Sequence, residues 1–578
     1  MFDWRSKDDQ FIIRFATQLQ ASLETERAAF EPMYNAAIRL YQPRRYDLQQ
    51  SQSLSTAELR SIAYGVRVFD ATPAMSLRKF GTSMAGNMVS REDNDPFWIQ
   101  FTAPNQRLME IDIIKQRLQE AQEQVRFGFN QSSFYRELPQ FLEDAGCTYG
   151  VMTAKRDLVN DRIVFQTRHP GTYWFHTNDF GDIDADHFKL KMTAYDLIQQ
   201  FGDNPNFPAS IKEDHDGVKD AKDPNPFKTY DVLHVTYKNQ SRRAGSLDAS
   251  DKEWIQFYIV MNCGKSGKDK VIVNGGGEEA GVDWRPITLR RGTVPGLAYP
   301  LSLALDGLTS ATYGNKIAQY QLLMSAHGSN PMALVHDKLR KQVHDTELNP
   351  GARIYTNDLA KHSMEFMVNT SQTAVAEFGL EKITEITRDV FFLPFFEMLT
   401  GTRDAPQRTA FEVSQMVQEK IPELTPVMES AEDAVLEPAS EIIWIYETEA
   451  GRMPIMPEEL FQGSRKVQNK YMGRFAQLKR SLREATGSLA QIQIMEAVGR
   501  IYPNALRIIR SEKFLEDTLI AHGGKQDHIF DEQDIRDMDA QAAAEEERDR
   551  QLAIGAEAGK ILPPGKAIEE NSPLAFAG

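Results

Sequence analysis

Two apolar stripes of helical spacing, separated by a short polar break, dominate residues 371–446. The apolar residues before the break recur every three to five positions and are Val375, Phe378, Ile383, Ile386, Val390 and Leu393. Those after it are Phe411, Val413, Met416, Val417, Ile421, Leu424, Val427 and Met428, continued by Leu436, Ile442, Ile443 and Ile445. This spacing predicts two amphipathic helices. Gly401, Asp404 and Pro406 end the helical pattern in the break, TGTRDAPQRT (400–409).

The second of these helices contains three prolines. One continuous helix over 409–446 would be about 57 Å long at 1.5 Å per residue. Pro422, Pro426 and Pro438 are therefore expected to kink or break it. The local pattern alone also describes a plain helical hairpin with a solvated loop.

The N-terminal 146 residues read as mainly helical. Residues 8–41 carry a first stripe, formed by Phe11, Phe15, Leu19 and Leu23, and stop at Gln42-Pro43. A second helix occupies 68–90, with Thr72 as a candidate N-cap and Pro73 at its first position. A strand is predicted within 94–104, and two further helices over 109–146.

From Cys147 to about Pro300 the pattern changes to short strands separated by turn residues, with one helix at 192–202 and an exposed loop at 203–228. A helix over 301–328 and a small strand-containing insertion at 329–370 follow. Residues 457–550 are expected to be helical again, and 551–578 to be mobile. The predicted fold class is therefore α+β, mostly helical.

Bulk properties exclude some classes of protein. The chain has 578 residues, 41% hydrophobic and 26% charged, as in ordinary globular proteins. It has no apolar run long enough to span a membrane, and its N-terminus mixes acids and bases unlike a secretory signal. Two cysteines favour a reducing compartment. The net charge of −16 has the wrong sign for a protein that binds duplex DNA tightly. It suits a protein that lets DNA pass without binding it. Many soluble enzymes are also acidic, so the charge discriminates weakly.

Segments that resemble known catalytic or ligand-binding motifs lack residues that those motifs require. CGKSGKDK (263–270) lacks the first glycine and the Ser or Thr of a phosphate loop, so it reads as a hairpin turn. DIDADH (182–187) has His187 where a calcium loop needs glycine, and it reads as a solvated strand end. Neither HExxH nor GxSxG occurs. We therefore predict no catalytic residue, no cofactor and no metal site.

Several segments, in this order, resemble the portal (head-to-tail connector) proteins of short-tailed, podovirus-type bacteriophages. They are ERAAFEPMYNAAIRLYQPRR (26–45), FDATPAMSLRKFGTSMAGNMVS (69–90), SSFYRELPQFLEDAGCTYGVM (132–152), GTYWFHTNDFGDIDADHFKLKMTAYDLIQQFG (171–202), RTAFEV (408–413) and IYPNALRIIR (501–510). Each piece is short, but their order and spacing together are specific. Departures occur at GLAYP, before the 301–328 helix, and at MGRFAQ (472–477).

The resemblance implies a portal architecture that assembles as a ring of twelve subunits at one capsid vertex of the virion, built in the host cytoplasm. The implied regions are an N-terminal helical part of the wing (1–146), a β-rich wing domain (147–300), stem helices (301–328 and 371–399), a clip (329–370), a tunnel loop (400–409), a long kinked wing helix (410–456), a crown (457–550) and a flexible tail (551–578).

The implied function is a non-catalytic channel through which double-stranded DNA is packaged and ejected, and which joins head to tail. The implied partners are the large terminase, a tail adaptor, the major capsid protein, and scaffolding and internal core proteins, with no membrane. The alternatives are a packaging nuclease or ATPase, which would need a phosphate loop or a carboxylate cluster, and an acidic scaffold that never encircles DNA.

A ring repeats every side chain around its axis, so one arginine becomes a ring of positive charge. Under the resemblance, Arg403 and Arg408 of the tunnel loop would touch passing phosphates, or would instead pair with acids such as Asp404 and Glu412. The expected acidic stem lining is Glu377, Glu381, Glu385 and Asp389. The expected clip contacts with adaptor and terminase are His336, Lys338, Arg340 and Arg353.

Overall fold

The computed structural model divides the chain into two compact units, Met1–Ala476 and Gln477–Gly578. The residues it describes, nearly all in the first unit, are 8–43, 68–89, 91, 97–103, 108, 111–157, 159–204, 207–217, 223–240, 242, 251–263, 269–274, 281–292, 296–331, 333–336, 353–356, 364–366, 373–399, 410–457, 460, 467–473 and 475–477. They form an α+β fold, which confirms the predicted class. Most of the predicted crown (457–550) and all of the tail (551–578) lie outside the described residues.

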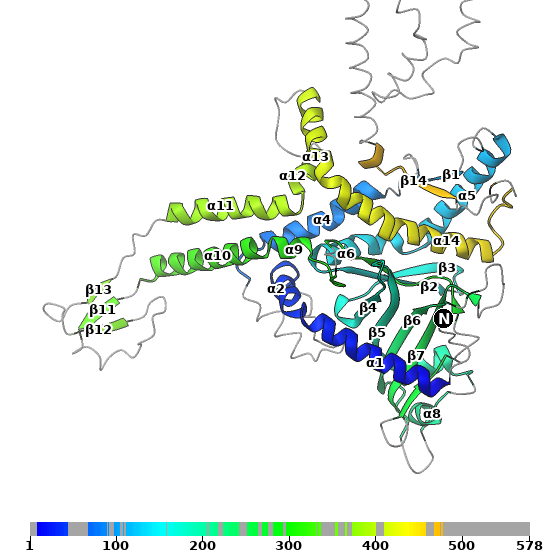
Figure 1. Ribbon diagram of the computed structural model, residues 1–578. Helices are drawn as coiled ribbons and strands as arrows, with labels where there is room; N and C mark the ends of the chain where they lie inside the picture. Colours follow the sequence, from blue (N-terminus) through cyan, green and yellow to red (C-terminus); the bar gives the residue numbers. More distant parts are fainter. Residues whose placement is uncertain are drawn as a thin grey trace, which may run out of the picture. The chain divides into compact units, whose positions relative to one another are not determined.

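Two antiparallel sheets form the centre of the first unit (Figure 1). The six-stranded sheet contains, in spatial order, β4 (Tyr173–Thr177), β5 (Ile183–Thr193), β6 (Thr229–Lys238), β7 (Trp254–Cys263) and β8 (Asp269–Ile272), with β9 (Gly281–Val282) also paired to β7. The three-stranded sheet contains β10 (Ile287–Leu289), β2 (Gly150–Asp157) and β3 (Arg162–Thr167). The strands β7 and β8 pair antiparallel, with Cys263 opposite Asp269, and the residues between them, where a hairpin turn is predicted, lie outside the described residues.

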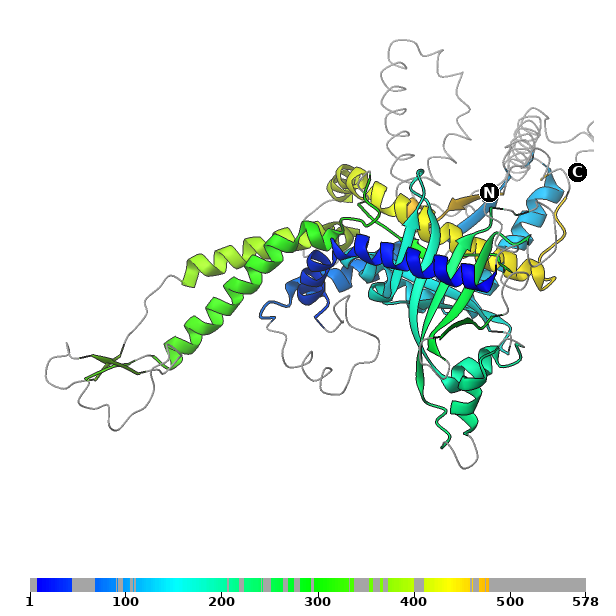
Figure 2. The same ribbon diagram turned by 60° about the horizontal axis from the view of Figure 1, so that its bottom comes forward.

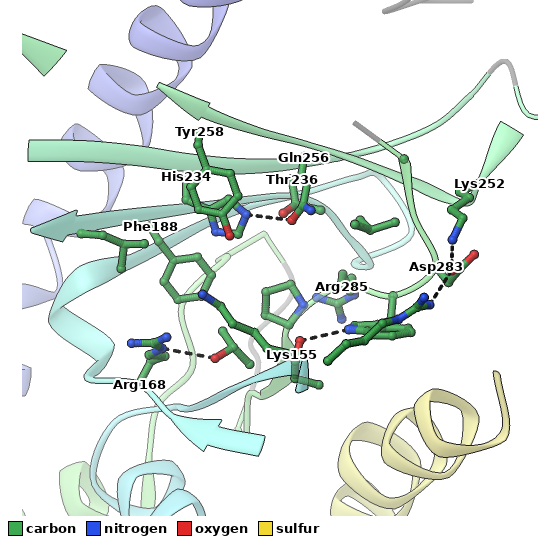
Figure 3. Close-up of a pocket in the computed structure, with 18 of the residues that line it drawn as sticks. Lys155, Arg168, Phe188, His234, Thr236, Lys252, Gln256, Tyr258, Asp283 and Arg285 are labelled. Carbon is green, nitrogen blue, oxygen red and sulfur yellow. Dashed lines mark hydrogen bonds and ion pairs between the residues drawn. The ribbon is translucent and has the colours of Figure 1, made fainter. Parts of the chain in front are cut away.

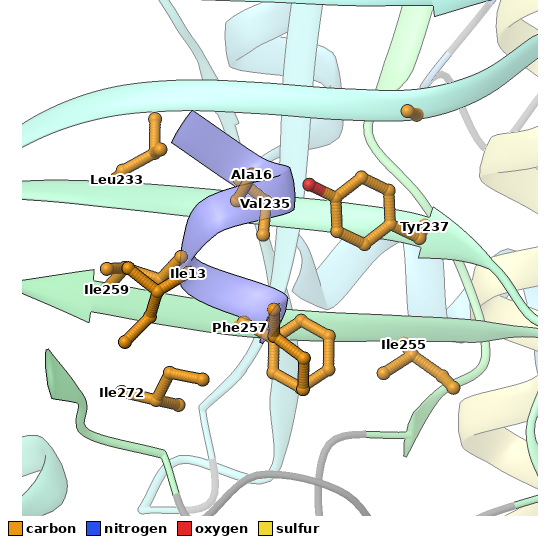
Figure 4. Packing of buried hydrophobic residues seen from close by; sticks show 11 residues of the cluster. Ile13, Ala16, Leu233, Val235, Tyr237, Ile255, Phe257, Ile259 and Ile272 are labelled. Atoms are coloured by element: carbon orange, nitrogen blue, oxygen red, sulfur yellow. The ribbon is translucent and has the colours of Figure 1, made fainter. Parts of the chain in front are cut away.

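Helix α1 (Asp9–Ala28) covers one face of the six-stranded sheet (Figures 2 and 4). Alternate residues of β6 face it, because side chains along a strand point to opposite faces. The buried cluster beneath α1 is Ile12, Ile13, Ala16, Ala185, Leu233, Val235, Tyr237, Ile255, Phe257, Ile259 and Ile272. This cluster is the apolar core of the sheet.

The predicted stripe of α1 is displaced at its N-terminal end, although Leu23 is buried as predicted and Leu19 packs against the core. Phe11 is 37% exposed, whereas Ile12 and Ile13 are buried and Phe15 packs only partly. The displacement brings the polar Gln20 into the buried face, where its Oε1 lies 3.0 Å from Nδ1 of the buried His187. A partner that is distant in sequence has therefore set the rotation of the helix.

Four further helices pack beside the sheets: α2 (Glu31–Tyr41), α4 (Thr72–Met88), α5 (Asp112–Gln131) and α6 (Phe134–Cys147). The predicted cap of α4 is wrong. Thr72 is the first helical residue, and it is Asp70 whose Oδ1 accepts a hydrogen bond from the Thr72 backbone N–H at 2.9 Å. The helices α4 and α6 touch closely, because a Cβ at Gly81 would lie 2.7 Å from the Pro139 carbonyl oxygen.

The predicted exposed loop at 203–228 is partly wrong. It contains the helix α8 (Ala209–Asp216), which follows the predicted helix α7 (Ala194–Phe201). Ile211 is fully buried, and the buried Asp214 accepts a hydrogen bond from Tyr230 and one from Lys228 at 2.7 Å. The sequence of α8 is mostly polar, and it buries only one side of the helix. For this reason the hydrophobic pattern did not predict it.

The segment 182–187 is not a solvated strand end. Asp186 and His187 on β5 have no exposed surface. Tyr173 donates a hydrogen bond to Asp186, and Arg285 lies 3.6 Å from the same carboxylate. Burial is thus sustained by polar partners from other strands.

After the two central sheets the chain forms α9 (Leu303–Asp306) and α10 (Leu308–Ser329), then a small sheet of β11 (Ala333–His336), β12 (Arg353–Thr356) and β13 (Met364–Phe366), then α11 (Thr373–Val390) and α12 (Leu393–Leu399). The helix expected over 371–399 is therefore two helices. Phe392 separates them with a φ of 55°, the left-handed conformation, which ends an α-helix.

The long proline-containing helix is continuous in path but irregular in hydrogen bonding. Pro422 and Pro426 lie inside α13 (Ala410–Ala431) without ending it. A π-helical segment, Glu432–Leu436, joins α13 to α14 (Glu437–Glu449), in which Pro438 lies in the first turn. The π-helical segment therefore lies just before Pro438. Proline has no backbone N–H, so Pro438 cannot donate the hydrogen bond that would continue a regular α-helix.

The region expected to be helical from 457 onward begins differently. Its described part contains the strand β14 (Gln468–Tyr471), which pairs antiparallel with β1 (Ile99–Thr102). Ile99 lies opposite Tyr471 in this two-stranded sheet. The first unit therefore extends to Ala476, beyond the predicted boundary at 456.

Candidate functional site

The helices α10 and α11 lie side by side, with the small sheet β11–β13 between them in the chain (Figures 1 and 2). Two glycines of this region, seven residues apart, permit close approach. A Cβ at Gly314 would lie 3.0 Å from Cγ2 of Ile383, and one at Gly307 would lie 3.4 Å from Cγ1 of Val390. The contact is therefore set by backbone proximity more than by large interlocking side chains.

The base of the helix pair is fixed by aromatic packing and charge. Phe391 is fully buried, with its ring 5.5 Å from that of Tyr41 and 5.8 Å from that of Phe80. Arg388 of α11 reaches across the break to Glu397 of α12 at 2.6 Å. These contacts set the direction in which α11 leaves the rest of the unit.

Acidic residues spaced by four occupy one side of α11. Glu381, Glu385 and Asp389 are exposed, while Glu377 belongs to the same helix and its side chain lies outside what the structure describes. The ammonium of Lys382 lies 2.9 Å from Glu385, and this hydrogen bond raises the pKa of Lys382. A shallow hollow beside them is lined by Glu381, Lys382, Thr384, Glu385, Arg388, Asp389 and Pro394.

Helix α10 instead exposes aromatic and aliphatic side chains, of which the two tyrosines share one side and Leu322 lies on the opposite one. Tyr313 and Tyr320, two helical turns apart, are 64% and 60% exposed. Leu322 and Leu323 are 58% and 40% exposed. Lys316 is the one lysine or arginine of this helix. The sequence stripe correctly predicted the helix, but the apolar surface exceeds what the single chain covers.

The remaining predicted site residues are only partly described. His336 is on β11 and is buried, so it is not an exposed contact in this chain. Arg353 is on β12, and Lys338 and Arg340 lie outside the described residues. Arg403 and Arg408 also lie outside them, between the end of α12 and the start of α13, so the alternative pairing with Asp404 and Glu412 stays a prediction.

A pocket of about 370 Å³ lies between the two sheets, on the face of the six-stranded sheet opposite α1 (Figure 3). Phe188, His234 and Tyr258 are paired neighbours on β5, β6 and β7. The His234 ring stacks on the Tyr258 ring at 4.1 Å and on the Phe188 ring at 5.9 Å. Burial, then Lys155 and Arg168, lower the pKa of His234 to about 3, so the imidazole is neutral.

The sequence pattern does not distinguish the residues of this pocket. Its polar side chains occupy alternate positions of β6 and β7, as those of a solvent-facing surface would. The signal that marks it is the pair of cations on the opposing sheet, Lys155 and Arg168.

The described residues contain no group of three or more His, Cys, Asp or Glu side chains that could hold a metal ion. Within the same residues, no helix is long and apolar enough to cross a membrane.

Comparison with known proteins places the chain in a family. The family model described as bacteriophage head to tail connecting protein matches residues 15–529. The chain is 23% identical over 575 residues to a protein of Salmonella phage epsilon15 named portal protein, covering 96% of each. It is also 23% identical over 450 residues to a protein of Bordetella phage BPP-1 named probable portal protein, covering 76% of this chain and 75% of that one. The chain therefore belongs to the bacteriophage head to tail connecting proteins.

Proposed function

We propose that this chain is a structural, non-catalytic portal subunit that assembles into a ring, of twelve copies by the family resemblance, at one capsid vertex. Double-stranded DNA would enter and leave through the central channel. Membership of the connecting-protein family supports the role, and both relatives carry the name portal protein. The terminase, tail adaptor, major capsid and internal core proteins are the partners that such a ring would meet.

The observation that carries the proposal is the two-sided character of the helix pair. Helix α11 exposes a line of acids, and α10 exposes tyrosines and leucines. In a ring, the apolar side of α10 would pack on the neighbouring copy, which removes apolar surface from water. The acids Glu381, Glu385 and Asp389, with Glu377, would line the channel and repel DNA phosphates, which keeps the passing duplex from binding.

The segments that lie wholly or partly outside the described residues have proposed roles of their own. The loop 400–409 would project into the channel, with Arg403 and Arg408 contacting phosphates. The segment 329–370 would offer Lys338, Arg340 and Arg353 to the terminase and later to the tail adaptor. The crown, 457–550, would face the interior of the capsid.

Electron microscopy of the purified protein, combined with its mass in solution, tests the ring. Closed rings with a central hole and a mass near twelve times 65.6 kDa would support it. A monomer or dimer that persists across salt and protein concentrations would favour the acidic scaffold that does not encircle DNA.

The arginine loop is tested separately in DNA packaging. The double substitution Arg403→Ala and Arg408→Ala should lower packaging or DNA retention while rings still form. Exchange of both for lysine is the matched control, because it keeps the charge. Normal packaging by the double alanine variant would contradict the assignment and favour pairing with Asp404 and Glu412.

A further inference from the structure

The pocket between the two sheets has more cationic groups than its carboxylates balance. Arg156 and Lys252 share two carboxylates: Asp283, at 3.3 and 2.6 Å, and Glu449, at 2.5 and 3.4 Å. Arg285 faces the buried Asp186 at 3.6 Å. These three cations are therefore already neutralised by acids of the chain.

Lys155 and Arg168 differ from those three cations. Neither forms an ion pair with any carboxylate among the residues that the structure describes, and both line the pocket. Arg168 donates from Nε to the Thr153 hydroxyl at 3.2 Å, which leaves its charge unbalanced. Desolvation, then Arg168, lower the pKa of Lys155, and burial lowers that of Arg168. Two like charges are held together at some cost in a largely acidic protein.

The opposite wall of the pocket supplies neutral polar groups. Figure 3 shows Lys155 and Arg168 on one side and His234, Thr236, Gln256 and Tyr258 on the other. The Gln256 Oε1 lies 3.2 Å from Nε2 of His234, and neutral His234 adds no charge to the wall. Thr236 and Gln256 bring a hydroxyl and an amide that can donate hydrogen bonds.

We propose that this pocket binds a small phosphate-bearing anion between Lys155 of β2 and Arg168, the residue after β3, on one wall and Thr236 and Gln256 of the six-stranded sheet on the other. A doubly charged oxyanion would balance both cations at once, and its several oxygens could accept from donors on both walls. The volume of about 370 Å³ is within the range of small-molecule sites and far too small for a duplex. The source is either free phosphate or a nucleoside monophosphate.

Binding would connect the two sheets, because its contacts come from both. A ligand that binds only the folded state raises the melting temperature with its concentration. The phosphate would thus act as a stabilising bridge within each subunit, independently of the channel.

Thermal unfolding and calorimetric titration of the purified full-length protein test the proposal, with sodium phosphate, adenosine monophosphate and sodium chloride at matched ionic strength. We expect phosphate or the nucleotide, and not chloride, to raise the melting temperature. Lys155→Gln should weaken binding about tenfold, and Lys155→Gln with Arg168→Gln should abolish it. Lys238→Gln, an exposed cation on β6 outside the pocket, is the control and should bind like the wild type.

The unliganded variants provide a second measurement. Removal of Lys155 relieves repulsion, so the unliganded Lys155→Gln protein should melt at or above the wild-type temperature. A response to both anions would assign free phosphate as the ligand, and a response to the nucleotide alone would assign the nucleoside phosphate. No shift with either anion, an equal shift in the double variant, or an equal shift with sodium chloride would overturn the proposal.

Discussion

The sheet core beneath α1 and the helix pair α10–α11 both arise from apolar periodicity, yet they end in different states. In the core, Val235, Phe257 and Ile259 have no exposed surface. In the helix pair, Tyr313 and Tyr320 are more than half exposed. The core is complete within one chain, whereas the helix pair has apolar surface that a further copy could cover. If the proposed ring forms, folding of the subunit and assembly of the ring should therefore depend on different residues.

The largest effect is expected in the core. Phe257→Ala should lower the free energy of unfolding by about 3–5 kcal/mol, because it leaves a cavity between β7 and α1. Urea denaturation of the subunit measures the change. A loss below 1 kcal/mol, on the order of a surface substitution, would show that the core is not closed between the sheet and α1.

The pH dependence of stability tests whether His187, at the edge of this core, is buried in its neutral form. Burial, then His234 and His176, lower the pKa of His187 to about 3 from 6.5. Because the folded pKa is the lower one, this contribution is complete above pH 6.5 and is lost as pH falls toward 3. The slope of unfolding free energy against pH from this one histidine should reach about 1.4 kcal/mol per pH unit. His187→Gln should reduce the slope of unfolding free energy against pH between pH 6 and 4, leaving the similar contribution of the buried His234, and an unchanged slope would contradict a buried neutral His187 imidazole.

Close contact in the helix pair gives an intermediate effect. Gly314→Val should destabilise the pair by about 1–3 kcal/mol, since even a Cβ would lie 3.0 Å from Ile383. Gly86→Ala in α4 is the matched control: nothing lies within 4 Å of its Cβ, so helix propensity should make it neutral or stabilising. Thermal unfolding compares the two, and equal melting temperatures would indicate that α10 and α11 are not in close contact.

The smallest effect on the subunit, with a larger one on assembly, is expected at the exposed tyrosines. Tyr320→Ala should change the free energy of unfolding of the subunit by less than about 0.5 kcal/mol. It should still reduce the fraction of protein in rings, measured by sedimentation. Lys316→Ala on the same helix is a control for helix content. Unimpaired ring formation by Tyr320→Ala would place the subunit contact elsewhere.

The sequence predicted those elements whose pattern is local. Alternation along β6 and β7 and the stripe of α11 have their cause in a few neighbouring residues. Strand β14 was missed because its partner β1 is more than 360 residues away in the chain. The burial of Asp186 and His187 was missed for the same reason, since their partners Tyr173, Arg285 and Gln20 come from other elements.

The candidate site follows the same division. Spacing by four is a local property of the sequence, and it places Glu381, Glu385 and Asp389 on one side of a helix. That spacing does not show that Phe392 ends the helix, because a left-handed residue is a consequence of the packing around Phe391. A pattern of alternating residues also does not distinguish a polar strand face that meets solvent from one that meets Lys155 and Arg168.

The π-helical segment Glu432–Leu436 determines which side of α14 faces the rest of the unit. A π turn accommodates one residue more than an α turn, so it acts as a single-residue insertion, and each residue turns a helix by about 100°. Ile442 and Ile443 are buried, and Ile443 touches the α5 backbone at Gly128. Deletion of one residue from this segment would restore a regular helix and rotate α14 by that angle, so its isoleucines would lose their place against α5. The length of this segment is thus as constrained as its composition.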